Sequence, residues 1–120
     1  MSELTLDRLD HLNLSVRDVN ATCAFYQRVL RMDVETFGHG RTSLRFGRHK
    51  INVEPAEHVT PAHLCLVTSA PLADWIEHLK ACGVVLRDGP VKRSGAEGPI
   101  SSIYLDDPDK HSIEISTYAV

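Results

Sequence analysis

The chain has 120 residues, of which 42% are hydrophobic and 24% are charged, the balance of a single soluble globular domain. Its formal net charge is −3, and basic and acidic residues are mixed along the sequence, which excludes the one-sided basic surface that nucleic acids or anionic membranes require. We expect no membrane span and no signal peptide, because no stretch is apolar over the necessary length. The three cysteines, Cys23, Cys65 and Cys82, are widely spaced, so we expect reduced, mostly buried thiols in a cytoplasmic protein.

The first half of the chain predicts a strand, a helix and three further strands. Residues 9–16 alternate apolar and polar side chains, as a half-buried strand does. A helix is expected at residues 21–31, where apolar residues recur at helical spacing after a capping Asp18 or Asn20. Three shorter strands are expected, at residues 34–37, 42–46 and 49–54.

The same order returns after a proline-containing linker at residues 55–61. A strand begins at His63, and a helix is expected at residues 71–82, with Pro71 in its first turn and Gly83 after its end. The remaining expected elements are a strand at 84–86, a loop rich in glycine and charge at 88–99, and strands at 100–105 and 111–116.

The two halves therefore form a duplicated βαβββ unit. The sequence HLNL at His11 is echoed by HLCL at His63, an offset of 52 residues (63 minus 11), and Trp75 follows Phe25 by 50 (75 minus 25). We interpret residues 1–120 as one α+β domain made of two modules, residues 8–55 and 61–118.

Polar residues alternate with apolar ones in the predicted strands, and the polar face has two explanations. Solvent exposure is one, since an antiparallel sheet with helices on one side commonly faces water on the other. The second is a metal site, because His11 and His63 begin equivalent strands and Glu114 lies in the last one. Two imidazoles and one carboxylate leave coordination positions open, as a catalytic divalent ion requires. The other histidines are interpreted as surface or hydrogen-bonding residues, namely His39, His49, His58, His78 and His111.

Three features of the sequence occur together: the doubled βαβββ order, the His-Leu-x-Leu openings, and the sequence DDPD at Asp106 ahead of Ile113-Glu114-Ile115. In these features the chain resembles the vicinal oxygen chelate superfamily, which includes glyoxalase I, fosfomycin-resistance enzymes, extradiol dioxygenases and bleomycin-resistance proteins. The resemblance covers essentially the whole chain, and it is nearest to small glyoxalase-domain proteins of unsettled substrate. It implies cupped mixed sheets with helices on the outer face, a divalent ion (Zn, Fe, Mn or Ni) between the cups, and a homodimer.

Carried over to this sequence, the resemblance implies that His11, His63 and Glu114 are the metal ligands. The fourth position, a glutamate in glyoxalase I, is Asn52 here, which disfavours glyoxalase I activity itself. Glu54 lies two residues further on the same face and is a candidate to replace the missing group as ligand or catalytic base.

Further residues are candidates for substrate contact. Ser102 and Tyr104 resemble a substrate-binding strand of fosfomycin-resistance enzymes, so Tyr104 is a second candidate proton carrier, although a solvent-facing tyrosine fits the pattern equally well. Arg45 is a candidate for binding an anionic group. Lys92 and Arg93 are further candidates for binding an anionic group, but we interpret them as solvated charges.

Two functions remain open from the sequence. The first is a metal-dependent enzyme with a small oxygen-bearing substrate, carrying out lyase or isomerase, thiol-transfer or dioxygenase chemistry. The second is a non-catalytic protein of the same fold that sequesters a ligand as bleomycin-resistance proteins do, and the amide at Asn52 supports it. A structural domain without any pocket is disfavoured by the polar face.

Overall fold

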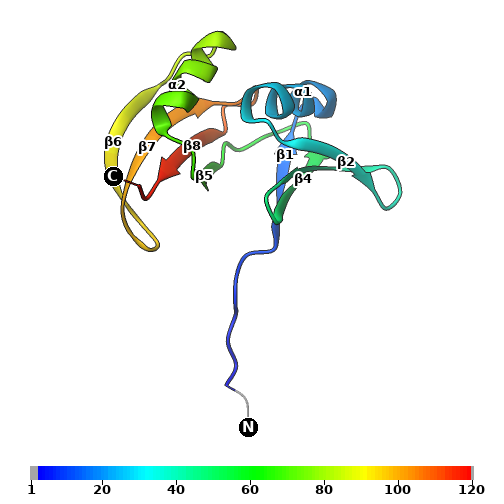
Figure 1. The fold of residues 1–120 in the computed structure, drawn as a ribbon. Helices are drawn as coiled ribbons and strands as arrows, with labels where there is room; N and C mark the ends of the chain where they lie inside the picture. The colour runs from blue at the N-terminus through cyan, green and yellow to red at the C-terminus, as the bar shows by residue number, and fades with distance from the viewer. Residues whose placement is uncertain (1–2, 120) are drawn as a thin grey trace.

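The computed structural model describes residues 3–119, and it confirms the duplicated βαβββ order and the α+β class (Figure 1). The first half comprises β1 (His11–Val16), α1 (Val19–Leu30), β2 (Asp33–Phe37), β3 (Arg41–Phe46) and β4 (His49–Pro55). The second half comprises β5 (His63–Val67), α2 (Leu72–Ala81), β6 (Asp88–Gly95), β7 (Gly98–Asp106) and β8 (Ser112–Thr117). Both helices lie on the same side of the molecule, above the strands in Figure 1.

Each half forms its own four-stranded mixed sheet. The strand orders are β1-β4-β3-β2 and β5-β8-β7-β6, and in each sheet the first two strands are parallel while the others are antiparallel. The register sets Asn13 beside Asn52 in the first sheet and Cys65 beside Glu114 in the second, so Asn52 and Glu114 occupy equivalent positions. The strands that begin with His11 and His63 are both edge strands.

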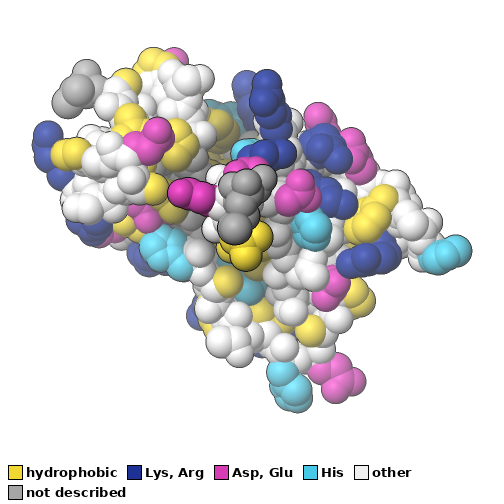
Figure 2. All heavy atoms as spheres, turned by 90° about the horizontal axis from the view of Figure 1, so that it is seen from below, with side chains coloured by type: hydrophobic (Ala, Val, Ile, Leu, Met, Phe, Trp, Pro, Cys, Tyr) yellow, Lys and Arg dark blue, Asp and Glu magenta, His cyan; other side chains and the backbone are white. Residues whose placement is uncertain are grey.

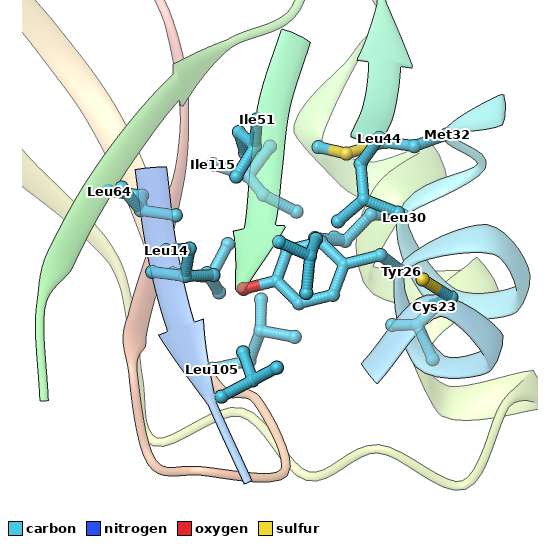
Figure 3. Close-up of a cluster of buried hydrophobic side chains, with 14 of the residues drawn as sticks. Leu14, Cys23, Tyr26, Leu30, Met32, Leu44, Ile51, Leu64, Leu105 and Ile115 are labelled. Atoms are coloured by element: carbon cyan, nitrogen blue, oxygen red, sulfur yellow. The ribbon is translucent and has the colours of Figure 1, made fainter. Parts of the chain in front are cut away.

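The apolar faces of both sheets and the two helices share one hydrophobic core (Figure 3). Its members come from both halves, among them Leu14, Tyr26, Leu44, Ile51, Leu64, Leu105 and Ile115. Each aliphatic side chain fully buried in this way contributes about 1.5–3 kcal/mol. Separating the halves would expose these residues, so the two modules form one cooperative unit.

Charged and polar contacts reinforce the junction between the halves. The buried Tyr26 hydroxyl of α1 donates a 2.7 Å hydrogen bond to Asp107 Oδ2, which follows β7. Arg17 Nη1, after β1, lies 3.0 Å from Asp109 Oδ1. The acidic DDPD turn, one of the features that carries the family resemblance, therefore has a structural role here.

His111 is a buried structural residue at the same junction, with only 1% of its surface exposed. Its Nδ1 accepts a 2.8 Å hydrogen bond from the backbone N–H of Ala62, so the ring proton resides on Nε2. That Nε2–H donates to the Ser15 carbonyl oxygen at 2.9 Å. His111 is thus a hydrogen-bonding residue, as expected, but it lies in the interior and not at the surface.

The sequence-based prediction was wrong for the segment before β7. Residues 84–86 do not form a strand, and most of the expected loop at 88–99 is the edge strand β6, paired antiparallel with β7. Glycine and charge are typical of loops, but here hydrogen bonding to β7 decides the structure. The register shifts between Asp88 and Val91, and a Cβ at Gly89 would lie 2.5 Å from the Ser102 carbonyl oxygen, which explains the glycine inside a strand.

Helix α1 begins as expected, with the Asp18 carboxylate accepting a 3.0 Å hydrogen bond from the Ala21 N–H. Among the residues that the structure describes, no helix combines the length and hydrophobicity needed to cross a membrane. Figure 2 shows basic, acidic and histidine side chains interspersed over the face seen from below, in agreement with the mixed charge of the sequence.

Candidate metal centre

The candidate centre is built around Glu114, a carboxylate buried on the polar face of β8. Its side chain is 7% exposed. Oε1 lies 2.8 Å from His63 Nε2 of β5, and Oε2 accepts a 2.6 Å hydrogen bond from the Ser102 hydroxyl of β7. The Ser116 hydroxyl lies 2.7 Å from that of Ser102 and 3.3 Å from Glu114 Oε2. Two strands on either side of β8 thus fix one carboxylate in a single orientation.

Hydrogen bonding keeps the Glu114 carboxyl ionised in spite of its burial. Burial by itself raises the pKa of the group. The hydrogen bonds that the carboxylate receives, from Ser102 and His63 above all, lower it by more, so the net pKa of Glu114 lies below its ordinary value. At neutral pH the side chain is therefore an anion, the form that ligates a metal ion.

His63 is the exposed partner of this pair, with 57% of its side chain accessible. An ionised carboxylate can only accept, so the imidazole donates its Nε2 proton to Glu114. The ring also lies near Tyr104, with 6.1 Å between the ring centroids. A proton held between a nitrogen and an oxygen at 2.8 Å is readily replaced by a cation, because both atoms are metal-ligating donors once the proton leaves.

Tyr104 lies directly opposite Glu114 across β7 and β8 and is 7% exposed. Its hydroxyl oxygen accepts a 3.0 Å hydrogen bond from Arg93 Nε of β6. Burial raises the pKa of the Tyr104 phenol, while Arg93 opposes the shift without cancelling it. The phenol therefore keeps its proton at neutral pH, beside both the carboxylate and a guanidinium.

Arg93, interpreted from the sequence as a solvated charge, lies beside Tyr104. Its side chain is 44% exposed and is anchored between the Tyr104 hydroxyl and Asp88, whose Oδ2 lies 3.6 Å from Arg93 Nη2. Its guanidinium carbon is 5.5 Å from the centre of the Tyr104 ring. The signal that identifies it is its place on β6, which requires knowing that residues 88–95 form a strand.

Asn52 is the equivalent of Glu114 in the first sheet. It is 3% exposed, and its Nδ2 donates a 3.0 Å hydrogen bond to Asn13 Oδ1 on β1. Ser43 of β3 lies opposite Asn52 and is also buried. Within residues 3–119, the Asn52 Oδ1 and Ser43 Oγ atoms have no hydrogen-bond partner. The first sheet thus presents neutral amide and hydroxyl groups where the second presents an anion.

His11 stands apart from the centre within one chain. Its Nδ1 lies 2.8 Å from Asp10 Oδ2, and 42% of its side chain is exposed. Among residues 3–119, no three His, Cys, Asp or Glu side chains come together in an arrangement that could hold a metal ion. The structure therefore brings His63 and Glu114 together, and it does not add His11 to them within a single copy.

The other charged candidates form ion pairs elsewhere on the first sheet. Glu54 Oε1 lies 3.1 Å from Arg41 Nη2, with 44% of the Glu54 side chain exposed. Arg45 Nε lies 2.9 Å from Glu35 Oε2. Neither belongs to the hydrogen-bonded group around Glu114.

Cys65 is next to the centre but is not activated. All three cysteines are free, and Cys65 is exposed where a mostly buried set was expected. Its Sγ lies 3.3 Å from Ser116 Oγ. Desolvation raises the pKa of the Cys65 thiol, with a further contribution from the Glu114 charge, so the thiol stays protonated at neutral pH.

A largely apolar groove of about 700 Å³, here named the β1–β5 groove, runs between the two edge strands. Its wall includes the apolar side chains Leu12, Leu30, Met32, Phe46, Leu64 and Trp75. His11 and His63 both contribute to the wall as well. The groove lies beside the candidate centre, because His63 belongs to both.

Comparison with known proteins gives a consistent family match. The sequence profile of the Glyoxalase/Bleomycin resistance protein/Dioxygenase superfamily matches residues 8–115. Virulence protein STM3117 of Salmonella typhimurium is 43% identical over 126 residues, covering 97% of this chain and 88% of that protein. The solved structure of VPC_CASS1 from the mobile metagenome of V. pseudocholerae is 42% identical and superimposes with a TM-score of 0.93, covering 99% of this chain and 100% of that one.

A more distant structure shares the fold alone. The fosfomycin resistance protein FosX of Listeria monocytogenes, solved with Mn(II) and 1S,2S-dihydroxypropylphosphonic acid, is 23% identical, with a TM-score of 0.72 over 94% of this chain and 93% of that one.

Proposed function

Because the chain belongs to the glyoxalase, bleomycin resistance protein and dioxygenase superfamily, we propose that it is a metal-dependent enzyme acting on a small, oxygen-bearing substrate. The metal ligands in this proposal are His63, Glu114 and His11. The observation that carries it is the 2.8 Å contact between His63 Nε2 and Glu114 Oε1, in which a buried anion and an exposed imidazole face each other.

The chemistry of these side chains fits a divalent transition metal. Imidazole nitrogen and carboxylate oxygen are ordinary ligands of Zn, Fe, Mn and Ni, and three protein ligands leave positions free for a substrate. Ser102 orients the carboxylate from the side away from His63, as an outer partner of a metal ligand does. The Mn(II) in the FosX structure is consistent with a divalent ion in this fold.

We place the third ligand in a second copy of the chain. Within residues 3–119 the His63–Glu114 pair lacks a third ligand of its own. A homodimer with two-fold symmetry supplies His11 from the other copy and completes two identical sites at once. Asn52 and Glu54 share a sheet face with His11 and reach the site by the same route, Asn52 to bind substrate and Glu54 to carry a proton.

The residues around Glu114 then have distinct tasks. When bound, the ion acts as a Lewis acid that stabilises a substrate oxygen gaining negative charge. Tyr104 retains its proton at neutral pH and donates a hydrogen bond to the substrate, while Arg93 holds the phenol in place. Ser102, expected from the sequence to contact substrate, is fully buried and instead orients the Glu114 carboxylate. Arg45 binds an anionic group of the substrate after giving up its pairing with Glu35.

This ligand set serves lyase, isomerase, thiol-transfer and dioxygenase chemistry alike, so the proposal extends to the reaction family and not to a single reaction. Ligand sequestration without chemistry is the competing function. It predicts ligand binding that is unchanged by chelators, whereas a metal-dependent enzyme loses substrate binding when the ion is removed.

The test is elemental analysis of protein purified without chelators. We expect about one divalent ion per chain in the wild type, loss of the ion in His63→Ala, and retention in Cys65→Ser, a control on the same face of β5. Full metal occupancy in His63→Ala would contradict the proposal. Substrate screening with each of the four metals restored would then identify the reaction.

A further inference from the structure

The N-terminal arm, residues 3–10, carries three exposed leucines, and two of them, Leu4 and Leu6, are not covered at all by their own chain. Leu4, Leu6 and Leu9 are 101%, 100% and 77% exposed, and the arm extends away from the body in Figure 1. Single exposed leucines are common on soluble proteins, whereas neighbouring exposed leucines can form an interaction surface. The fold of one copy leaves Leu4 and Leu6 uncovered.

The β1–β5 groove is an apolar surface that its own chain leaves partly uncovered. It is an apolar cavity of about 700 Å³, within the range of about 300–1,000 Å³ that is typical of binding sites. Both strands that border it are edge strands, each paired on one side only. Leu12, Phe46 and Trp75 on its wall are only partly buried by their own chain.

The arm and the groove match in pattern and in charge. Leu4 and Leu6 lie two residues apart, so in an extended segment both point to one face. The arm bears Glu3, Asp7 and Asp10 against one basic residue, Arg8. The groove wall contributes Lys50 and His49, and the one acidic residue among its described lining residues, Asp10, is paired with His11.

We propose that the N-terminal arm of one copy docks in the β1–β5 groove of a second copy, and that the exchange is reciprocal. Leu9 and Asp10 already form one end of the groove in their own chain, and from there the arm leads outward, toward a neighbour. A two-fold axis lets each copy give its arm and receive the other, which buries Leu4 and Leu6 of both copies.

This docking goes beyond the proposed enzyme and does not depend on a metal ion. It has a consequence for the candidate centre, because the arm runs directly into His11 at the start of β1. An anchored arm ties the position of His11 in one copy to the body of the other.

The first test measures self-association by sedimentation velocity over a range of protein concentrations. Leu4→Ser/Leu6→Ser should weaken dimer formation at least tenfold. Thr5→Ser, on the opposite face of the arm, is the matched control and should leave it unchanged. A wild-type protein that stays monomeric at all concentrations, or a double variant that dimerises as the wild type does, would overturn the proposal.

The second test locates the docked arm. Trp75 is the only tryptophan and lies in the groove wall, so its fluorescence reports groove occupancy. The wild-type emission should shift to longer wavelength on dilution, and the double variant should show the long-wavelength emission at every concentration. Emission that is the same for both proteins throughout the dilution series would overturn docking in this groove.

A cross-linking experiment distinguishes exchange from folding back within one chain. The photo-reactive residue p-benzoylphenylalanine replaces Leu6, and light and isotopically heavy chains are mixed before irradiation. Cross-links between light and heavy peptides that contain residues 46–51 or 63–69 support exchange. Cross-links within single chains only, or between copies at another surface, contradict it. Metal content is measured separately, so a dimer that forms through another surface overturns the docking and leaves the proposed enzyme untouched.

Discussion

Removing the Ser102 hydroxyl should destabilise the protein in a pH-dependent way. In the wild type this hydroxyl donates a 2.6 Å hydrogen bond to Glu114 Oε2, in a site where Ser102 is 0% and Glu114 5% exposed. A hydrogen bond to a buried charged group contributes about 1.5–3 kcal/mol. We therefore expect Ser102→Ala to lose about that much stability at pH 7.

The loss converts to a change in melting temperature. With an unfolding entropy of about 2.1 cal/mol/K per residue, a chain of this length shifts by roughly 4 °C for each kcal/mol. Thermal denaturation followed by circular dichroism should then show a decrease of about 6–12 °C at pH 7. Ser101→Ala is the control, because Ser101 points to the other face of the same strand.

The dependence on pH follows from the direction of the Glu114 pKa. The pKa is lower in the folded than in the unfolded protein, so the carboxylate contributes stability above its unfolded pKa. That stability is lost as the pH falls through the folded pKa. The difference between wild type and Ser102→Ala should accordingly shrink as the pH falls below about 4. An equal difference at pH 7 and pH 3, or a loss no larger than that of Ser101→Ala, would refute the argument.

Two further variants test the contacts described above. Tyr26→Phe removes the donor to buried Asp107 and should lower the free energy of unfolding by about 1.5–3 kcal/mol in urea denaturation, whereas the exposed Gln27→Ala should change it by less than about 0.5 kcal/mol. An unchanged midpoint in Tyr26→Phe would mean that this contact is not formed. Arg93→Ala should raise the pKa of the Tyr104 phenol further, because the Arg93 hydrogen bond lowers it, and ultraviolet titration against a Tyr104→Phe reference measures the shift; a lower pKa in Arg93→Ala would contradict the assignment.

The fold was predictable from local patterns where the sequence alternates regularly between apolar and polar residues or repeats itself. Alternation at residues 9–16 and the echo between His11 and His63 were sufficient to predict the duplicated modules, and the Asp18 cap was confirmed. Strand β6 was missed because Gly89 and its irregular register hide a strand whose pairing with β7 is set by tertiary contacts.

The site was predictable only in part, because its contacts join residues far apart in sequence. The contact between His63 and Glu114 spans 51 residues, and no local motif indicates it. The duplication pointed to His63 and Glu114 as members of one group, and the family resemblance implied that they are ligands. The contact of Arg93 with Tyr104 could not be foreseen without the strand that positions it. Leu4 and Leu6 were not predicted to dock, because an apolar residue near a terminus carries no pattern that distinguishes a docking arm from a tail.

The central claim is that a divalent ion is held by His63 and Glu114 of one copy and by His11 of another. The most direct test mixes two inactive parents, His11→Ala and His63→Ala, under conditions that allow the copies to exchange, and then measures bound metal. Each mixed dimer regains one intact site and each parental dimer none, so random pairing should restore metal to about a quarter of all sites. Retention of metal by either parent alone, or no recovery on mixing although mixed dimers form, would contradict the account.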